Sequence, residues 1–294
     1  PLLYEAWMRL NWPKVEAVTG VIDVAHATGL IPCATSAPLV VTVHDLAVLH
    51  DPEKFSKHGV KSMTRALDLA RRRADRILCP SRATMDDCRA HGFDDDQLRL
   101  VPLGVDAAPA TAQELADARR RHDLPDRFVL FVGTLEPRKN LRRLVAAMAS
   151  VGETAGAVPL VVAGAGAWGD VRAELDAADV RLLGAVSDAD LRGLYAAATV
   201  FAYPSEREGF GLPVAEAMAQ GTAVVTSRGT STEEVAGGAA ILVEPLDVDD
   251  IARGIREAMD RHEELAAPSR SRAGEMSWRR SAIATLAVYR ELCS

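Results

Sequence analysis

The chain of 294 residues is too long for one ordinary core, so its length predicts two domains. Its charged fraction of 26% excludes general disorder, and its net charge of −7 argues against a chain-wide nucleic-acid binder. The four cysteines form no CxxC pair and no metal-ligand spacing with histidine, which is typical of buried or free thiols in a reducing compartment. No apolar run reaches the ~18 residues that a membrane span needs.

The first part of the chain alternates short apolar runs with helical patterns. Runs rich in valine, isoleucine and leucine predict strands, and their apolar character on both faces is typical of a parallel sheet covered by helices. The pattern pauses near residues 104–126, where alanine, proline and charged residues predict a domain boundary. Strands are expected within 21–26, 39–45, 76–81 and 98–104, and helices over 65–76 and 82–91.

The alternation then restarts and predicts a second, complete doubly wound domain. The expected fold class is therefore α/β, with two Rossmann-like domains over 1–106 and 107–276. Ligands of such sheets bind beyond the carboxyl ends of the strands, so residues that follow strands are the functional candidates. The strands of the second domain are expected within the segments 128–150, 159–170, 180–198, 199–205, 223–227 and 239–245.

The stretch "YPSEREGFGLPVAEAMAQG" holds two glutamates on either side of a glycine-rich turn. Gly209 and Gly211 allow a ligand to approach the backbone closely, and the free N–H groups of the following helix predict an anion site. Glu216, expected in the first helical turn, would accept hydrogen bonds from a ribose diol, and Glu208 would lie across the anion site. This arrangement fits a nucleotide-sugar. A plain strand–turn–helix, with Glu216 favouring the helix dipole, explains the spacing equally well.

Two further stretches place polar groups after strands. In "FVGTLEPRKNL", Gly133 ends a strand, and Arg138 and Lys139 stand near the start of the next helix, where a bound diphosphate would offset their unfavourable charge. Two solvated surface cations are the alternative. In "VVTVHDL", His44 ends a strand and could donate to an oxygen or transfer a proton. The alternative is a histidine at the edge of the core that bonds to the backbone.

Three other patterns have simpler explanations. "GAGAWG" at 164–169 matches the GxGxxG fingerprint of NAD-binding proteins, but it follows the second strand of its domain and not the first. "DDD" at 94–96 contains the Asp-x-Asp of metal-dependent sugar transferases, but a polar turn explains it. The basic face around Arg71–Arg76 could meet an anionic membrane surface, although a solvated helix face is the simpler interpretation.

The combined motifs cover nearly the whole chain. They include "VVTVHDLAVLHDPEKF" (40–55), "VGTLEPRKNL" (132–141) and, most specific, "PSEREGFGLPVAEAMAQGTAVVTS" (204–227). With these motifs the chain resembles the family 4 glycosyltransferases, retaining enzymes of the GT-B fold, in which two Rossmann-like domains face a cleft. The pair Glu208 and Glu216 matches the E-x7-E motif of that family.

The resemblance implies a role for each matching residue. Glu216 would bind the donor ribose and Glu208 would contact the transferred sugar, whereas His44 would face that sugar from the acceptor-side domain. The final helix, 278–292, would pack back on the acceptor-side domain. The residues that would hold the donor are Gly133, Thr134, Arg138, Lys139, Gly184, Glu208, Gly209, Phe210, Gly211, Leu212 and Glu216.

The implied reaction moves a hexose from a nucleotide diphosphate sugar to a glycan, lipid-linked or small-molecule acceptor, with retention of anomeric configuration. The donor is expected to be GDP-mannose or a similar hexose donor such as UDP-glucose. No metal or other cofactor is expected, because Lys139 and Arg138 supply the cations. The leaving phosphate would take the proton of the acceptor, so no carboxylate nucleophile is needed. Such an enzyme would be cytoplasmic and could lie peripherally on the inner membrane face.

Two features depart from the family pattern. Thr134 stands where many relatives carry arginine, so Arg138 and Lys139 would carry more of the diphosphate grip. The opening "PLLYEAWMRLNWP" resembles a point well inside the first domain, which is therefore expected to lack its opening strands. Two alternatives stay open: a nucleotide-sugar-binding protein without transferase activity, and a related epimerase or hydrolase.

Overall fold

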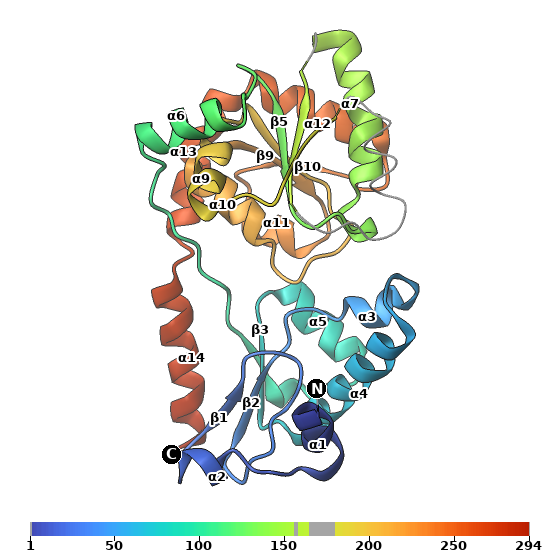
Figure 1. Ribbon diagram of the computed structural model, residues 1–294, viewed down its shortest axis with the longest axis vertical. Helices are drawn as coiled ribbons and strands as arrows, with labels where there is room; N and C mark the ends of the chain where they lie inside the picture. The colour runs from blue at the N-terminus through green and yellow to red at the C-terminus, as the bar shows by residue number, and fades with distance from the viewer. Residues whose placement is uncertain (1, 156–157, 165–179, 294) are drawn as a thin grey trace. The chain divides into compact units, whose positions relative to one another are not determined.

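The computed structural model describes residues 2–155, 158–164 and 180–293 and divides the chain into two compact units (Figure 1). The first unit comprises Pro1–Gly104 together with Trp278–Ser294, and the second comprises Val105–Ser277. The C-terminal segment therefore belongs to the same unit as the first strands. Each unit contains its own sheet of parallel strands.

The sheet of the first unit has four strands in chain order. They are β1 (Ala25–Ala27), β2 (Leu39–Thr42), β3 (Arg76–Cys79) and β4 (Leu98–Leu100). All three pairings between neighbours are parallel, so β1 and β4 form the edges. The strands predicted within 39–45, 76–81 and 98–104 are confirmed, whereas β1 shares only residues 25–26 with the predicted run 21–26 and extends to Ala27.

Alternate residues of a strand point to opposite faces of the sheet. Because both sets are apolar here, helices cover both faces. Val41 and Ile77 pack in a core with residues of α4 (Lys57–Arg73) and α5 (Arg82–Ala90). Val40 and Leu78 pack on the other face against Val288 of α14 (Trp278–Leu292). The remaining helical segments of this unit are α1 (Leu2–Leu10), α2 (Glu16–Thr19), α3 (Ala47–His50), η1 (Pro52–Lys54) and η2 (Asp95–Gln97).

The helix expected over 65–76 is wrong at both ends. The helix α4 begins at Lys57, where the Ser56 side chain accepts a hydrogen bond from the Gly59 N–H and caps it. It ends at Arg73, and Arg76 already belongs to β3. The apolar residues set the helical periodicity, and the charged residues at the end of the segment do not mark where it stops. The predicted helix therefore extends into the start of β3.

The sheet of the second unit has six parallel strands in the order β10-β9-β8-β5-β6-β7. This is the doubly wound order. Successive strands from β5 to β7 are added on one side of β5, and from β8 onward they are added on its other side, so the switch point lies between β5 and β8. These two strands pair directly, with Val129 beside Val200. The strands are β5 (Val129–Val132), β6 (Leu160–Ala163), β7 (Val180–Gly184), β8 (Val200–Tyr203), β9 (Ala223–Ser227) and β10 (Ile241–Val243).

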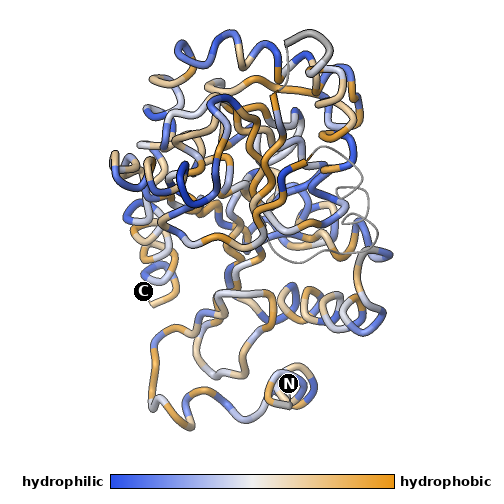
Figure 2. The backbone as a smooth tube through the Cα atoms, turned by 45° about the horizontal axis from the view of Figure 1, so that its top comes forward, coloured by the Kyte–Doolittle hydropathy of each residue, from blue (hydrophilic) through white to orange (hydrophobic). Residues whose placement is uncertain are grey.

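Helices form a layer on each side of this sheet (Figure 1). On one side α7 (Leu141–Ala155) packs against α12 (Val248–Asp260), and on the other α10 (Leu212–Gln220) packs against α9 (Asp188–Ala197) and α13 (His262–Gly274). Figure 2 shows hydrophobic strands in the middle of the unit and hydrophilic stretches along the helices around them. None of the helices in the described parts of the chain has the length and hydropathy that a membrane span requires.

The segment that the sequence left as a domain boundary contains a helix, α6 (Ala112–Arg121). Thr111 and Glu114 form a capping box at its start, in which each side chain accepts a hydrogen bond from the backbone N–H of the other. The helix packs on α9, where a Cβ at Gly193 would lie 2.6 Å from the Ala118 side chain. The T-x-x-E pattern was the sequence signal that could have revealed this helix.

Two glycines at the strand ends of this sheet should differ in how much an alanine substitution lowers the stability of the fold. A Cβ at Gly164 would lie 1.9 Å from the backbone oxygen of Gly133, whereas a Cβ at Gly184 would meet nothing within 4 Å. We expect Gly164→Ala to lower the free energy of unfolding by about 2–3 kcal/mol, because the backbone must move to admit the methyl group. Gly184→Ala carries only the strain of its positive φ, about 1 kcal/mol. Urea denaturation of both variants tests this, and equal losses would contradict it.

Candidate functional site

Two loops meet at the point where the winding of the six-stranded sheet reverses. One follows β5 over 133–140 and includes η3 (Pro137–Lys139), and the other follows β8 over 204–211. The Glu206 N–H donates to the Arg138 carbonyl oxygen at 2.9 Å, and Ser205 Oγ lies 3.0 Å from the same oxygen. In open α/β sheets the crevice at such a switch point is the usual ligand site.

Glu208 lies at the centre of this pair of loops. Its Oε1 accepts hydrogen bonds from Lys139 Nζ at 2.5 Å, from the Tyr203 hydroxyl at 3.0 Å and from the Ser205 hydroxyl at 2.7 Å. Its Oε2 pairs with Arg138 Nη1 at 3.1 Å. The side chains of Glu208 and Lys139 are each only 9% exposed. A bound anion was expected to offset the two cations, but in the protein alone Glu208 pairs with both of them and Glu136 pairs with Arg138.

The electrostatics of this cluster keep Glu208 ionised. Burial would raise the pKa of Glu208, but the charges of Lys139 and Arg138 outweigh it, so the pKa is lowered from its ordinary value. Burial also lowers the pKa of Lys139, and the attraction of Glu208 opposes that shift. Burial and the Glu208 charge raise the pKa of Tyr203, so its hydroxyl stays neutral and donates. A carboxylate in this state is a fixed acceptor and a poor proton donor.

Arg138 also contacts a second carboxylate in the loop after β5. Its Nε lies 2.8 Å from Glu136 Oε2, and the exposed Thr134 hydroxyl donates to Glu136 Oε1 at 2.6 Å. Gly133, the first residue after β5, has a positive φ of 154°. A diphosphate at this loop would therefore share Arg138 with Glu136 and Glu208.

The helix α10 begins directly after the second loop. Gly211 is its N-cap, with φ 106°, and a Cβ there would lie 2.7 Å from the Thr232 side chain. Leu212 and Pro213 are the first two helical residues, and Glu216 is the fifth. The expectation that Glu216 lies in the first turn is therefore wrong. Because dipole effects fade beyond the first turn, the dipole explanation of Glu216 loses its physical basis.

Glu216 is held by a tyrosine from α9. The hydroxyl of the buried Tyr195 donates to Glu216 Oε2 at 2.8 Å. Burial raises the pKa of Glu216, and the bond from Tyr195 opposes this rise only in part. No side chain among the described residues donates to the second oxygen, Oε1. The carboxylate is thus oriented and partly desolvated, with one oxygen open to a diol.

This pKa shift predicts how stability depends on pH. A carboxyl group with a raised pKa in the folded state favours folding below its ordinary value of 4.5, and this contribution is lost as the pH rises through the folded-state value. We therefore expect Glu216→Gln to be more stable than the unchanged protein at neutral pH, with the difference shrinking as the pH falls to 4.5. Thermal melts from pH 4 to 8 measure it. A glutamine variant that is less stable at every pH would contradict the assignment.

The other expected donor residues lie along the same edge. Phe210 is buried at the start of α10, beside the buried Gly209, and Leu212 is half-buried. Gly184 is exposed at the end of β7, two strands away from β5, and its carbonyl accepts from the Gly164 N–H at 2.8 Å. The structure thus joins Arg138, Lys139 and Glu208 by direct contact and places the remaining residues at neighbouring strand ends.

His44 belongs to the other unit, where it follows β2 and is exposed. Its Nε2 donates to the Thr28 carbonyl oxygen at 3.1 Å, which is the backbone bond that the simpler interpretation expected. The neighbouring His26 bonds to the Tyr289 hydroxyl at 2.6 Å and to Thr42 Oγ1 at 2.8 Å, and so ties α14 to the strand ends. A catalytic role for His44 stays a prediction.

The structure shows hydrogen bonds or ion pairs for the "DDD" turn and for the basic face, two of the three patterns with simpler explanations. Asp94 caps its own turn by accepting from the Asp96 N–H at 3.2 Å, and Asp95 pairs with Arg89 at 2.6 Å. Of the GxGxxG match, residues 165–169 lie outside the described residues. In the basic face, Arg72 pairs with Asp68 at 2.7 Å and Arg76 with Glu291 at 2.7 Å.

The sequence analysis missed the tyrosines that orient the two glutamates. Tyr203 ends β8, and Tyr195 lies on α9, 21 positions before Glu216. A strand-terminal tyrosine just before the S-x-x-E segment was the available signal for Tyr203. No local pattern links Tyr195 to Glu216, because the two helices meet only in the folded unit.

Comparison with known proteins decides the family. The model described as "Glycosyl transferases group 1" matches residues 113–275, and the model described as "Glycosyltransferase Family 4" matches residues 7–108. The chain belongs to glycosyltransferase family 4. It is therefore an enzyme of a retaining family that uses nucleotide-sugar donors.

Named relatives are similar over most of the chain. The O-antigen chain mannosyltransferase B of Escherichia coli is 34% identical over 267 residues, which cover 86% of this chain and 70% of the relative. The MMP alpha-(1->4)-mannosyltransferase of Mycolicibacterium hassiacum is 33% identical over 298 residues, covering 92% of this chain and 71% of that one.

Solved structures identify the fold as GT-B. Sucrose-phosphate synthase from Thermosynechococcus elongatus superposes with a TM-score of 0.78 at 23% identity, over 94% of this glycosyltransferase and 75% of that chain. HepE of Anabaena, in complex with UDP and glucose, gives a TM-score of 0.74 at 20% identity, over 92% and 78% of the two chains. The two parallel sheets of four and six strands fit this fold.

Proposed function

We propose that this glycosyltransferase moves a hexose from a nucleotide diphosphate sugar to an acceptor hydroxyl, with retention and without a metal ion. The observation that carries the proposal is the pairing of Lys139 and Arg138 with Glu208 at the switch point. It places two cations and an ionised acceptor beside the start of a helix. The oriented carboxylate of Glu216 lies on the same helix.

These groups divide the donor between them. The diphosphate binds Lys139 and Arg138 and the first free N–H groups of α10, since a helix start favours an anion. The ribose diol binds Glu216 Oε1, and the hexose hydroxyls bind the loop around Glu208. The nucleotide contacts the ends of the strands, at Gly133 and Thr134 after β5 and at Gly184 of β7.

The chemistry follows from the charges. The bond between the anomeric carbon and the diphosphate breaks, the acceptor oxygen bonds to that carbon on the same face, and the acceptor proton passes to the leaving phosphate. The negative charge that develops on the diphosphate is stabilised by Lys139 and Arg138, which removes the need for a divalent cation. Glu208, with its lowered pKa and its bonds to two cations, is unsuited to act as a general acid.

The similarity to two mannosyltransferases favours a mannosyl donor and a saccharide acceptor. We infer GDP-mannose as the first donor to test, with UDP-glucose second. A cytoplasmic location and a glycan or lipid-linked acceptor stay part of this proposal. A membrane contact near Arg71–Arg76 is also part of this proposal. Within that face Arg72 pairs with Asp68 and Arg76 pairs with Glu291, which reduces the positive charge available to a membrane.

A donor panel tests the proposal. The protein is incubated with GDP-mannose, UDP-glucose and dTDP-glucose, with and without mannosyl and glucosyl acceptors, and products are analysed by mass spectrometry and by the anomeric proton couplings. We expect an acceptor-dependent product with the anomeric configuration of the donor. Sugar release without acceptor would favour a hydrolase, a changed sugar in the donor would favour an epimerase, and binding without turnover would favour a binding protein.

A substitution at His44 tests its proposed role toward the reacting sugar. His44→Ala is expected to lower kcat by about 100-fold, the usual scale for a lost proton-transfer or hydrogen-bonding group, with nucleotide affinity within a factor of about two. His58→Ala, at an exposed histidine of α4, is the matched control. Unchanged kcat would remove His44 from the mechanism, and loss of folding would support a structural role.

A further inference from the structure

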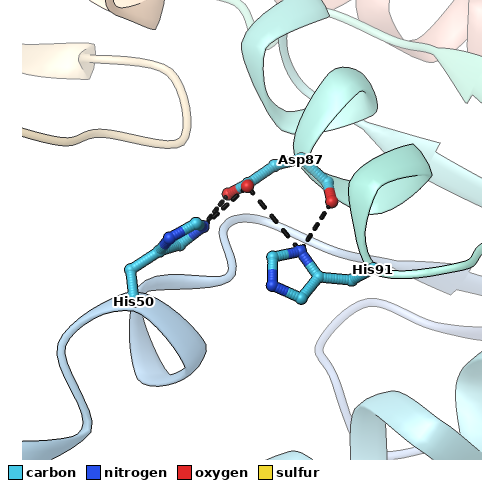
Figure 3. A group of neighbouring side chains, drawn as sticks. All are labelled: His50, Asp87 and His91. Carbon is cyan, nitrogen blue, oxygen red and sulfur yellow. Dashed lines mark hydrogen bonds and ion pairs between the residues drawn. The ribbon is translucent and has the colours of Figure 1, made fainter.

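Three side chains of the first unit lie close together, and none of them belongs to the proposed donor residues (Figure 3). His50 is the last residue of α3, Asp87 lies in α5, and His91 is the C-cap of α5. One nitrogen of each histidine and one carboxylate oxygen all lie within 4.8 Å of one another. Each side chain is partly open to solvent, with exposures of 24%, 19% and 32% in that order.

Local structure aims these groups at one another. Asp87 and His91 are four residues apart, so they lie on one face at the end of α5. The His91 Nδ1 donates to the Asp87 carbonyl oxygen at 2.8 Å, which turns this nitrogen toward the carboxylate at 3.8 Å. From α3, His50 Nε2 lies 2.6 Å and 2.8 Å from the two carboxylate oxygens.

We propose that His50, Asp87 and His91 bind a divalent transition-metal ion, with Zn²⁺ as the best match. Two imidazoles and one carboxylate are a donor set that zinc prefers, and a fourth position is left for water. The ion binds His50 Nε2, one Asp87 oxygen and His91 Nδ1, and links α3 to α5.

The present spacing needs little change to admit the ion. Tetrahedral bonds of about 2.0–2.1 Å place ligand atoms about 3.3 Å apart. The observed separations of 2.6 Å and 3.8 Å from the Asp87 carboxylate lie on either side of that value, and the two histidine nitrogens lie within 4.8 Å of each other, so both imidazoles rotate as the ion binds. The zinc ion takes the place of the proton between His50 and Asp87 and of the proton on His91 Nδ1. The Asp87 carbonyl keeps its bond from the His91 backbone N–H at 3.1 Å.

An ion pair between α3 and α5 is the competing explanation, but it needs only His50 and Asp87. In that explanation His91 only caps the end of α5 through its bond to the Asp87 carbonyl oxygen, and the close approach of its ring to His50, with centroids 5.2 Å apart at an interplanar angle of 87°, has no role. The expectation that sugar transfer uses no metal is unaffected, because none of the three residues belongs to the proposed donor set. Only Asp87 and His91 are close in sequence, and His50 lies 37 residues before Asp87, so no local pattern predicts this cluster.

Metal titration of the untagged, chelator-treated protein tests the proposal. Co²⁺ binding is followed by visible absorption, and Zn²⁺ binding by competition and calorimetry, on the unchanged protein and on Asp87→Asn, His50→Ala and His91→Gln. We expect one equivalent of Zn²⁺ per chain, with tetrahedral Co²⁺ bands. Each variant is expected to bind about tenfold or more weakly, and His58→Ala is expected to bind as the unchanged protein does.

The variants are chosen to keep the fold. Asparagine retains an acceptor for His50, and glutamine retains a donor for the Asp87 carbonyl, so circular dichroism should match that of the unchanged protein. Absence of Zn²⁺ binding, binding unaffected by Asp87→Asn, or an equal loss in His58→Ala would each overturn the proposal. If one variant fails to fold, the other two still decide the outcome.

Discussion

Replacing Lys139 with alanine is expected to lower the free energy of unfolding by about 3–5 kcal/mol. The reason is that Glu208 would keep its charge in a nearly buried position with Arg138 as its remaining ion-pair partner. Urea denaturation followed by circular dichroism measures this loss. Arg143→Ala is the control: Arg143 pairs with Glu206 at 2.7 Å, but both side chains are about a third exposed, so the expected loss is below about 1 kcal/mol.

A double substitution separates the ion pair from other effects of Lys139. In Lys139→Met with Glu208→Gln, no charge of the pair is left buried, and glutamine still accepts from Tyr203 and Ser205. We expect the double variant to be more stable than Lys139→Met alone, and comparison with the single variants Lys139→Met and Glu208→Gln should give a coupling energy of about 1–3 kcal/mol between the two sites. Strictly additive losses would show that the two side chains do not form the buried pair described above.

The second large effect is expected in nucleotide binding. Glu216→Ala removes a charge-assisted acceptor for the ribose diol, which should cost about 1.5–3 kcal/mol, or roughly 10- to 150-fold in the Kd of GDP or UDP. Calorimetry of the nucleoside diphosphates measures this directly. Glu263→Ala, at an exposed glutamate of α13, should leave the Kd unchanged.

Tyr195→Phe distinguishes a ribose contact from a general effect of the carboxylate. It keeps the charge of Glu216 but frees its Oε2, so we expect a smaller loss, within about tenfold, because orientation alone is weakened. If Glu216→Ala binds the diphosphates as tightly as the unchanged protein, the ribose assignment is wrong, whatever the result for Tyr195.

Local sequence patterns predicted the strands but not the contacts of the site. The apolar runs overlap each strand of the described residues because a buried parallel strand is apolar on both faces. They also placed the Gly133 and Glu208 loops at strand ends, and the topology then brought the two loops together at the switch point. The ion pair between Lys139 and Glu208 spans 69 residues, so no local pattern could reveal it.

Helix starts were the weakest part of the prediction. The start of α4 was placed eight residues too late, at Arg65 instead of Lys57. Glu216 was expected in the first turn of its helix, but it is the fifth helical residue, counted from Leu212. Charge alone was also an unreliable guide: the two cations before α7 suggested a missing anion, whereas Glu208 and Glu136 already pair with them. The side chains that balance a charge come from distant segments, and only the folded chain identifies them.

The most direct test of the account is a crystal structure of the protein with GDP or UDP bound. The account predicts the diphosphate within hydrogen-bond distance of Lys139 and Arg138, beside the first turn of α10, and both ribose hydroxyls on the Glu216 carboxylate. A nucleotide bound elsewhere, or a ribose that makes no contact with Glu216, would contradict it.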